Sequence, residues 1–254
     1  MDDIRFREDF KHLVDLIDSS RAMTAFTGAG VSTLSGIPDF RGSHGVYTDP
    51  WNGMDVEEII SLDFFAKHPE VFYAWAKDVW YHLEDYEPNV VHRTLASLEK
   101  KGILKALYTQ NIDMLHQRAG SKNVYEVHGG PEHHHCTKCH AEYGYDYVAP
   151  IVRAGEVPRC TKCGGIKPDI VFYGENLDEN VLQSAWRDFS NTDLCLVLGS
   201  SLVVQPAASF PMIAFRSGAK VVIVNAQPTS QDYYATLRFN DLGQTFEALS
   251  KVYG

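Results

Sequence analysis

The sequence predicts an α/β protein built on a doubly wound parallel sheet, with a smaller lobe made of a zinc-binding module and a helical insertion. Two observations predict the sheet: near-continuous apolar runs resemble strands covered on both faces, and segments with helical spacing lie between them. Two stretches interrupt this alternation, one rich in aromatic residues and one carrying four cysteines, and they predict the smaller lobe.

Helix and strand patterns recur along the chain in the order that such a sheet requires. A helix over Asp9–Ser19 precedes a strand over Arg21–Thr27, and a helix over His92–Lys100 precedes a strand over Ile103–Thr109. The other predicted elements are a short strand, two apolar strands and a helical segment between these two: Val124–Val127, Asp193–Gly199, Lys220–Asn225 and Pro206–Arg216.

The two interrupting stretches divide the chain into a main and a small domain. Residues 42–83 place aromatic side chains at helical spacing without a convincing strand, which indicates a helical module. Residues 129–167 hold the cysteines and form a zinc-binding module. The main domain then consists of residues 1–41, 84–128 and 168–254.

Charge and hydropathy narrow the classes of partner. The formal net charge of −10 argues against direct nucleic-acid binding, which needs clustered basic residues, and suits lysine-containing partners. The charged start of the chain, and the absence of an apolar run of the roughly 18 residues that a membrane span needs, predict a cytoplasmic protein with no membrane partner. We expect a monomer.

Four of the five cysteines form the most specific motif. Cys136 and Cys139, followed by Cys160 and Cys163, are two Cys-x-x-Cys pairs, which in a cytosolic chain predict tetrahedral zinc and not disulfides. Because the protein would fill all four positions, the zinc should stabilise the module and take no part in chemistry. The alternative is that a nearby histidine replaces one cysteine: His133, His134, His135 or His140.

A glycine-rich turn follows the first predicted strand. Gly28, Ala29 and Gly30 allow a tight turn whose backbone N–H groups can approach a pyrophosphate. The dinucleotide fingerprint is incomplete, because Thr33 stands at the place of its third glycine and no acidic residue ends a second strand about twenty residues on. A purely structural turn is therefore the alternative.

An acid, an aromatic ring and a cation come together just after this turn. Asp39, Phe40 and Arg41 can cover a bound cofactor. The alternative is a capped loop with a surface ion pair between Asp39 and Arg41.

Further polar residues follow other predicted strands, at the edge where open α/β sheets bind ligands. Gln110, Asn111 and Asp113 can hold a ribose hydroxyl and a carboxamide, or Asn111 or Asp113 can simply cap a helix. His128 can serve as general base for a hydroxyl, or as a hydrogen-bonded structural residue.

Small polar residues follow the last two apolar strands. Gly199, Ser200 and Ser201 can contact phosphate or ribose, and Asn225 can replace the acidic residue that binds an adenosine ribose. Alternatively, each is a turn residue.

In this order the motifs resemble those of the sirtuin family, and the resemblance runs from roughly Phe10 to Leu249. It rests on GAGVS at 28–32, GIPDFR at 36–41, TQNID at 109–113, HG at 128–129, the four cysteines, PDIVFYGE at 168–175 and GSSLVVQP at 199–206.

The resemblance implies an NAD-dependent protein lysine deacetylase, in which a Rossmann-like domain joins a lobe with a zinc ribbon, and NAD and an acetyl-lysine protein or peptide meet in the cleft between them. By the family's mechanism the acyl oxygen attacks the nicotinamide ribose and nicotinamide leaves. His128 then deprotonates a ribose hydroxyl, which attacks the intermediate and gives O-acetyl-ADP-ribose. Asn111 is the second catalytic residue that the resemblance implies.

The resemblance also assigns binding residues. For NAD they are Gly28, Ala29, Gly30, Thr33, Phe40, Arg41, Gln110, Asn111, Ile112, Asp113, Gly199, Ser200, Ser201 and Asn225. For the peptide, which would add as a strand between two loops, they are Val171, Phe172, Gly174, Glu175, Val203 and Val204. Ala76 and Val79 align with the Tyr and Arg of members that prefer succinyl or malonyl groups, which favours a neutral acyl group here.

Three alternatives remain at this point. A protein ADP-ribosyltransferase would share the scaffold and the release of nicotinamide. A non-catalytic NAD and zinc scaffold would have no need of His128 beside a ribose site. A dehydrogenase is disfavoured by the incomplete glycine fingerprint.

Overall fold

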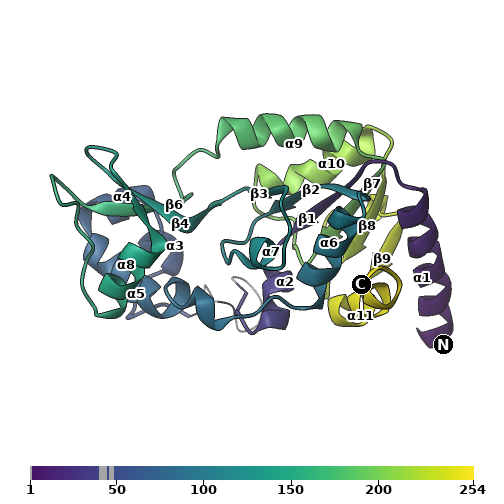
Figure 1. Ribbon diagram of the computed structural model, residues 1–254, viewed down its shortest axis with the longest axis horizontal. Helices are drawn as coiled ribbons and strands as arrows, with labels where there is room; N and C mark the ends of the chain where they lie inside the picture. The colour runs from purple at the N-terminus through teal and green to yellow at the C-terminus, as the bar shows by residue number, and fades with distance from the viewer. Residues whose placement is uncertain (1, 40–44, 46–48) are drawn as a thin grey trace.

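The computed structural model describes residues 2–39, 45 and 49–254. A large parallel sheet and a small antiparallel sheet lie at opposite ends of an elongated molecule, and both termini lie beside the large sheet (Figure 1). None of the helices in these ranges is long and apolar enough to cross a membrane.

The large sheet has the strand order β3-β2-β1-β7-β8-β9, and every neighbouring pair is parallel. Its strands are β1 (Met23–Thr27), β2 (Leu104–Thr109), β3 (Val124–Glu126), β7 (Leu194–Leu198), β8 (Lys220–Val224) and β9 (Leu237–Phe239). The chain builds outward from β1 in one direction and from β7 in the other, so the strand order reverses between these two strands. This topology confirms the predicted doubly wound sheet and puts its ligand-binding crevice at the carboxyl ends of β1 and β7.

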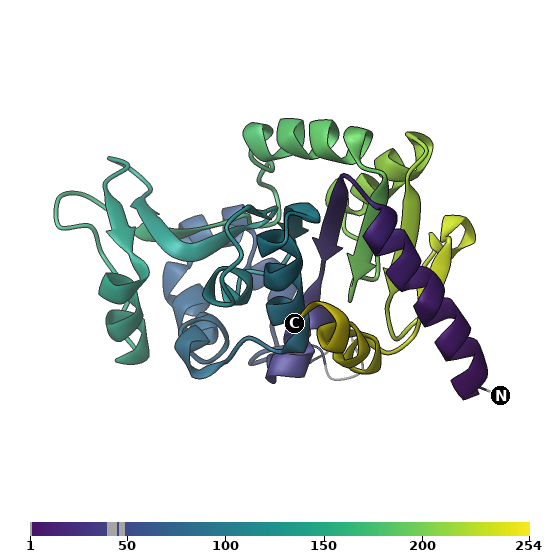
Figure 2. The ribbon, with the colours of Figure 1, turned by 45° about the vertical axis from the view of Figure 1, so that its right-hand side comes forward.

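Helices cover both faces of this sheet. One face carries α1 (Asp2–Ser19), α6 (Val90–Lys100) and α11 (Leu242–Tyr253), and the other carries α9 (Glu179–Asn191) and α10 (Phe210–Arg216). Adjacent residues of β1 show the alternation, since Ala25 packs in the first layer and Phe26 packs in the second. In Figure 2, α9 runs along the top of the large sheet.

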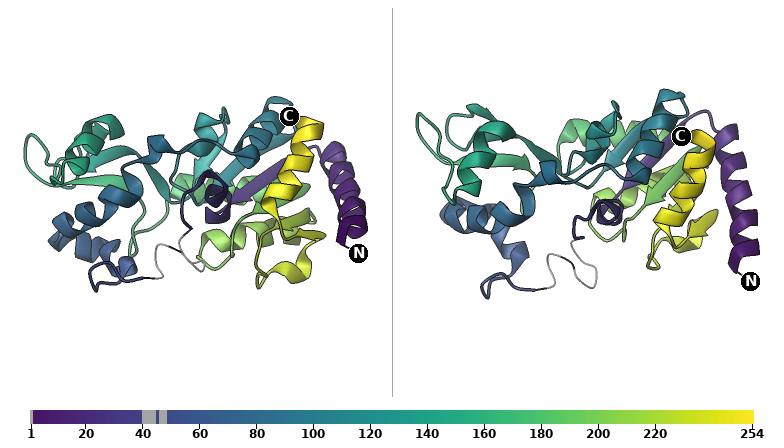
Figure 3. Two further views of the ribbon diagram at one scale, coloured as in Figure 1. Left: turned by 90° about the horizontal axis from the view of Figure 1, so that it is seen from below. Right: turned by 60° about the horizontal axis from the view of Figure 1, so that its bottom comes forward.

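The first helix is longer than its apolar pattern predicts, because it begins at Asp2 and not at Asp9. The extra turns carry Phe6, whose ring lies 5.9 Å from the ring of Phe10 and 5.9 Å from that of Phe239. Near its other end α1 lies beside α11 (Figure 3), where the Tyr253 hydroxyl donates to the Asp18 carboxylate over 2.7 Å.

The small lobe combines the two interrupting stretches. Its sheet has the order β5-β4-β6, with β4 (Gly129–Cys136), β5 (Glu142–Gly144) and β6 (Ile166–Ile170) antiparallel. Around it pack α3 (Val56–Ile59), α4 (Leu62–Lys67), α5 (Pro69–Trp80) and α8 (Tyr145–Arg153). The aromatic-rich stretch is helical as predicted, and its rings form the core of this lobe.

Two short helices, α2 (Ala29–Ser32) and α7 (Leu115–Arg118), lie just beyond the carboxyl ends of β1 and β2. Single 3₁₀ turns occupy Thr33–Ser35, Leu83–Asp85, Ala207–Ser209 and Asp232–Tyr234.

Candidate active site and zinc site

A cleft of about 880 Å³ opens at the carboxyl ends of the central strands. The predicted site residues that line it are Gly28, Ala29, Gly30, Thr33, Gln110, Asn111, Ile112, His128, Val171, Phe172, Gly174, Glu175, Gly199, Ser200, Ser201, Val204 and Asn225. Residues from six separate parts of the sequence, at 28–33, 110–112, 128, 171–175, 199–204 and 225, therefore meet at the edge where a doubly wound sheet binds its ligand.

Three glycines allow the turns after β1 and β7 to touch. The N–H of Gly28 donates to the carbonyl of Leu198, and the N–H of Gly30 donates to that of Gly199, both over 2.9 Å. A Cβ on Gly28 or Gly30 would stand 2.8 Å from a backbone atom of Gly199, which itself has a φ of +59°. The N–H groups of Gly28 and Gly30 thus join the two turns, and both glycines line the cleft.

The incomplete glycine fingerprint has a structural reason. The helix after the turn, α2, ends at Ser32, so no long helix packs against the sheet at position 33. The Thr33 hydroxyl instead donates to the carbonyl of Gly30 over 2.9 Å and stabilises the turn.

Amide side chains connect the ends of the three central strands. The Gln110 amide donates to the Ser200 hydroxyl over 2.9 Å, and the Asn111 amide donates to the carbonyl of Gly28 over 3.0 Å. These bonds fix both amide side chains relative to the glycine turn.

His128 stands on the cleft wall, two residues after the end of β3. Its Nδ1 lies 3.1 Å from the carbonyl oxygen of Gln110. Because a carbonyl oxygen only accepts hydrogen bonds, Nδ1 must carry the proton, and in the neutral ring Nε2 then has the lone pair. This is the tautomer that a general base needs.

Asp113 does not line the cleft, although it belongs to the same motif. Its carboxylate is buried, accepts from the Ser32 hydroxyl over 2.5 Å and accepts from the N–H of Leu115 over 2.9 Å. Burial raises the pKa of the Asp113 carboxyl. The bond satisfies the N–H of Leu115, the first residue of α7, whose N-cap position is held by Met114. The assignment of Asp113 to the nicotinamide end stays a prediction.

The loop after β6 forms the opposite wall. Its residue Val171 donates its N–H to the carbonyl of His128 over 2.8 Å, which ties this loop to the histidine. On the facing loop Val204 lines the cleft, whereas Val203 does not line it and is 62% exposed. Phe40 and Arg41 lie outside the described residues, and Asp39 lines the cleft.

Several lining residues were not predicted. Ile60 and Trp80 reach the cleft from the small lobe, and residues 240–243 reach it from the start of α11. No local pattern distinguishes Trp80 from the other aromatic residues of its helix. Asp241, in contrast, is a residue type that favours a helix N-cap, and the sequence could have predicted α11 from it. Ala76 and Val79 pack in the small-lobe core and are not among the residues that line the cleft, and the preference for a neutral acyl group stays a prediction.

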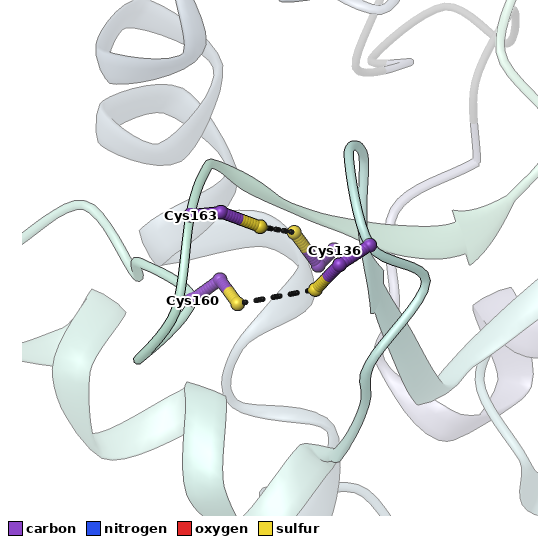
Figure 4. A group of neighbouring side chains, drawn as sticks. Cys136, Cys160 and Cys163 are labelled. Carbon is purple, nitrogen blue, oxygen red and sulfur yellow. Dashed lines mark hydrogen bonds between the residues drawn. The ribbon is translucent and has the colours of Figure 1, made fainter.

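The four cysteines of the zinc motif converge at one end of the small lobe, with their sulfur atoms all within 4.8 Å of one another. The Cys136 and Cys163 sulfurs are 3.7 Å apart, and those of Cys139 and Cys160 are 3.6 Å apart. Tetrahedral zinc with Zn–S bonds of about 2.3 Å needs sulfurs about 3.8 Å apart. In Figure 4 the sulfurs of Cys136 and Cys163 face each other across this group.

Backbone groups around the sulfurs suit thiolate ligands. The N–H of Lys138 points to the sulfur of Cys136, and that of Lys162 points to the sulfur of Cys160, both over 3.4 Å. Such contacts stabilise a deprotonated thiol, which is the form that binds zinc. The cysteines therefore form a site for one structural zinc ion.

The nearby histidines do not replace a cysteine. His134 contacts the hydroxyl of Tyr81 over 2.9 Å, and His135 pairs with Asp169. Among the residues that the structure describes, the only group with metal-ligand geometry consists of the four cysteines.

The chain thus combines a cleft at the point where the strand order reverses with a four-cysteine zinc module. Comparison with known proteins assigns it to one family. A model of the Sir2 family matches residues 28–206. This chain belongs to the Sir2 family, whose members are the sirtuins.

Its relatives are similar over nearly their whole length. An NAD-dependent protein deacetylase of Thermotoga maritima is 46% identical over 231 residues, which are 91% of this chain and 92% of the relative. NAD-dependent protein deacylase 2 of Archaeoglobus fulgidus is 40% identical, over 96% of this chain and 95% of the relative.

Solved structures agree with the fold. A structure of Sir2 with a p53 peptide and NAD⁺ has a TM-score of 0.86 and 44% identity, covering 96% of each chain. A structure of Sir2 bound to an acetylated peptide has a TM-score of 0.84 and 43% identity, again covering 96% of each chain.

Proposed function

We propose that this chain is an NAD-dependent protein lysine deacetylase, which transfers an acetyl group from lysine to ADP-ribose and releases nicotinamide and O-acetyl-ADP-ribose. Full-length relatives named as NAD-dependent deacetylases support this reaction. The observation that carries it within this chain is His128, on the cleft wall and in the tautomer of a base. A non-catalytic NAD and zinc scaffold would have no need of a base at this position.

In this proposal the chain's residues divide the work along the cleft. The glycine turn and Ser200 bind the dinucleotide, because glycine at positions 28 and 30 lets its phosphates approach the backbone closely. Asn111, fixed by its bond to Gly28, orients the nicotinamide ribose. The acyl oxygen then attacks the ribose carbon, nicotinamide leaves, and Nε2 of His128 takes the proton of the ribose hydroxyl that attacks the intermediate. Attack by water then releases the lysine amine and leaves the acetyl group on ADP-ribose.

The peptide side and the domain division are also proposals. The acetyl-lysine segment would add as a strand between residues 171–175 and residues 203–204. The main domain comprises residues 1–41, 84–128 and 168–254, and the small domain residues 42–83 and 129–167. We further propose a cytoplasmic monomer that binds neither nucleic acid nor membranes, and five cysteines free of disulfides support a reducing location.

The test is mass spectrometry of an acetyl-lysine peptide incubated with the zinc-loaded protein, with and without NAD. We expect loss of acetyl only with NAD, and one O-acetyl-ADP-ribose for each acetyl lost. His128→Ala should lower this rate about 10²- to 10⁴-fold, as expected for a general base. Unchanged turnover in His128→Ala would show that another group is the base.

The ADP-ribosyltransferase alternative predicts a different distribution of label. Label from NAD would then appear on protein, and nicotinamide would form without loss of acetyl from lysine. The names of the relatives favour deacetylation.

A further inference from the structure

A lysine is buried in the small lobe, at the base of the loop that forms one wall of the cleft. Lys167 lies on β6 and is only 3% exposed. Its ammonium forms an ion pair with Glu175 over 2.8 Å and donates to the carbonyl of Ile170 over 2.8 Å and to that of Pro168 over 3.1 Å. It also lies 4.0 Å from the centre of the Phe172 ring. One cation thus holds four points of the segment 168–175.

The partner of this lysine acts on the same segment. The Oε2 atom of Glu175, which pairs with Lys167, also accepts the N–H of Phe172 over 2.7 Å. The Glu175 carboxylate is therefore already engaged by its own loop, although its side chain is 25% exposed and reaches the cleft. Direct contact of Glu175 with the peptide stays a prediction from the sequence.

Backbone bonds carry this arrangement to both sides of the cleft. Val171 donates to the carbonyl of His128, and Tyr173 donates to the carbonyl of Ile60 over 3.0 Å. Leu62 in turn donates to the carbonyl of Tyr173 over 3.0 Å. The segment held by Lys167 is thus the bridge between the histidine and the helical part of the small lobe.

Burying an ammonium group is unfavourable unless it is paired and hydrogen-bonded. Burial lowers the pKa of Lys167, and the neighbouring Glu175 opposes that change. An apolar residue could fill the same volume without this cost. The ammonium differs from such a residue in that it can bind two carbonyls and a carboxylate of the loop at once.

We propose that the Lys167–Glu175 pair is a positioning device that holds segment 168–175 in the conformation that receives the acetyl-lysine peptide. Glu175 then acts through its own loop, and Lys167 is a positioning residue and not a catalytic one. The proposal rests on the deacetylase function proposed above and deepens it.

Steady-state kinetics on the zinc-loaded protein tests this. Lys167→Met and Glu175→Gln should each raise the KM for an acetyl-lysine peptide about tenfold, because a lost charged hydrogen bond has an effect of roughly this size. The kcat and the KM for NAD should stay within about twofold. Lys167→Arg keeps the charge and should restore most of the peptide KM.

The double variant Lys167→Met/Glu175→Gln separates positioning from direct contact. If the pair acts as one unit, the double variant should be no worse than either single variant. An additive rise in the peptide KM would mean that Glu175 contacts the peptide itself, and would overturn the proposal.

The matched control is Glu87→Gln, which removes an exposed ion pair with Arg118 outside the cleft and should leave both KM values unchanged. If Lys167→Met fails to fold, Glu175→Gln decides, because it keeps both lysine–carbonyl bonds. A normal peptide KM in Glu175→Gln, in a preparation where the unsubstituted protein is active, overturns the positioning role alone. An inactive unsubstituted protein instead overturns the proposed function and this inference with it.

Discussion

The two walls of the cleft are held in place by different physical means. On the sheet side, the turns after β1 and β7 touch through backbone, and there is no room for a Cβ at Gly28, Gly30 or Gly199. On the small-lobe side, segment 168–175 is held by a buried charge pair, and its Gly174 has open space around the position of a Cβ.

This difference shows how each wall tolerates change. A backbone contact at van der Waals distance allows one residue type, because any side chain must displace the neighbouring chain. A charge pair can be loosened in steps by single substitutions without a steric clash. We therefore expect substitutions on the sheet side to act on the fold and on NAD, and those on the small-lobe side to act mainly on the peptide.

Loss of zinc should lower the activity more than any other change, because it should disorder the small-lobe wall. β6 connects the second cysteine pair to segment 168–175, so Cys160→Ser should remove both the metal and the order of this wall. Structural zinc contributes on the order of 10 kcal/mol to the folding of small modules. We expect the deacetylation activity of Cys160→Ser to fall below detection. Mass spectrometry of the native protein measures whether zinc is still bound.

The parallel sheet has its own core and should survive this loss, which would appear as a second unfolding step on heating. The control is Cys195→Ala, since this fifth cysteine is buried in β7, away from the metal site. Cys195→Ala should retain full zinc. Full activity in metal-free Cys160→Ser would contradict the dependence of this wall on zinc.

One substitution made on both walls tests the comparison directly. In Gly199→Ala the Cβ would stand 2.6 Å from the nitrogen of Val31, at a φ of +59°. The left-handed conformation costs about 1–2 kcal/mol, and overpacking costs about 1–3 kcal/mol more. Gly174→Ala, at a φ of +91° with no atom within 4 Å, should show only the conformational cost.

Urea unfolding of both variants gives the two free energies of unfolding, and titration with NAD gives the affinities. We expect weaker NAD binding in Gly199→Ala only. An equal loss in the free energy of unfolding in the two variants would show that the backbone near Gly199 moves aside without cost, and would contradict the difference between the walls.

The sequence predicts more of the sheet side than of the small-lobe wall. The sheet and the zinc motif follow from local patterns, whereas the buried charge pair depends on tertiary packing. The apolar runs and the spacing of Cys136, Cys139, Cys160 and Cys163 are local patterns, and they were enough to predict the parallel sheet and the zinc site. Lys167 gives no such signal, because a lysine is ordinarily a surface residue and only the packing of the lobe buries it. The bond between Asp113 and Ser32 likewise gives no local signal, because it joins residues 81 positions apart.

Some elements were readable and were not predicted. Helix α11 has an N-cap at Asp241 and buried residues at Phe246, Leu249 and Tyr253, which is the spacing of one helical face. The reach of Trp80 into the cleft follows instead from how the small lobe docks against the sheet, which no local pattern encodes.

A second charge pair, on the sheet side, sharpens the comparison. Arg238 pairs with Asp232 over 2.8 Å and donates to the carbonyls of Asn225 over 3.0 Å and Gln227 over 2.7 Å. Arg238→Met removes all three of these contacts from the loop that carries Asn225, so it should raise the KM for NAD about tenfold and leave the peptide KM unchanged. This is the reverse of the pattern expected for Lys167→Met, and a rise in the peptide KM would show that the walls are coupled.

The smallest expected effect is a change in stability with pH, at the connection between β3 of the large sheet and β4 of the small sheet. Glu126 ends β3, accepts from the Gln117 amide over 2.8 Å, and would stand 2.9 Å from a Cβ on Gly130 in β4. Burial raises the pKa of Glu126 to about 6 from an ordinary 4.5. Because the folded carboxyl binds its proton more tightly, its contribution to stability is complete below about pH 4.5 and is lost as the pH rises through about 6.

Glu126→Gln removes this titration and keeps an acceptor for Gln117. Near pH 7.5 the variant should be more stable than the unsubstituted protein by up to ~2 kcal/mol, and this gain should shrink as the pH falls toward 4.5. Urea unfolding of both proteins across this range measures the difference, with Glu142→Gln on the exposed side of β5 as the matched control. A stability difference that does not vary with pH would mean that the pKa of Glu126 is the same in the folded and the unfolded protein.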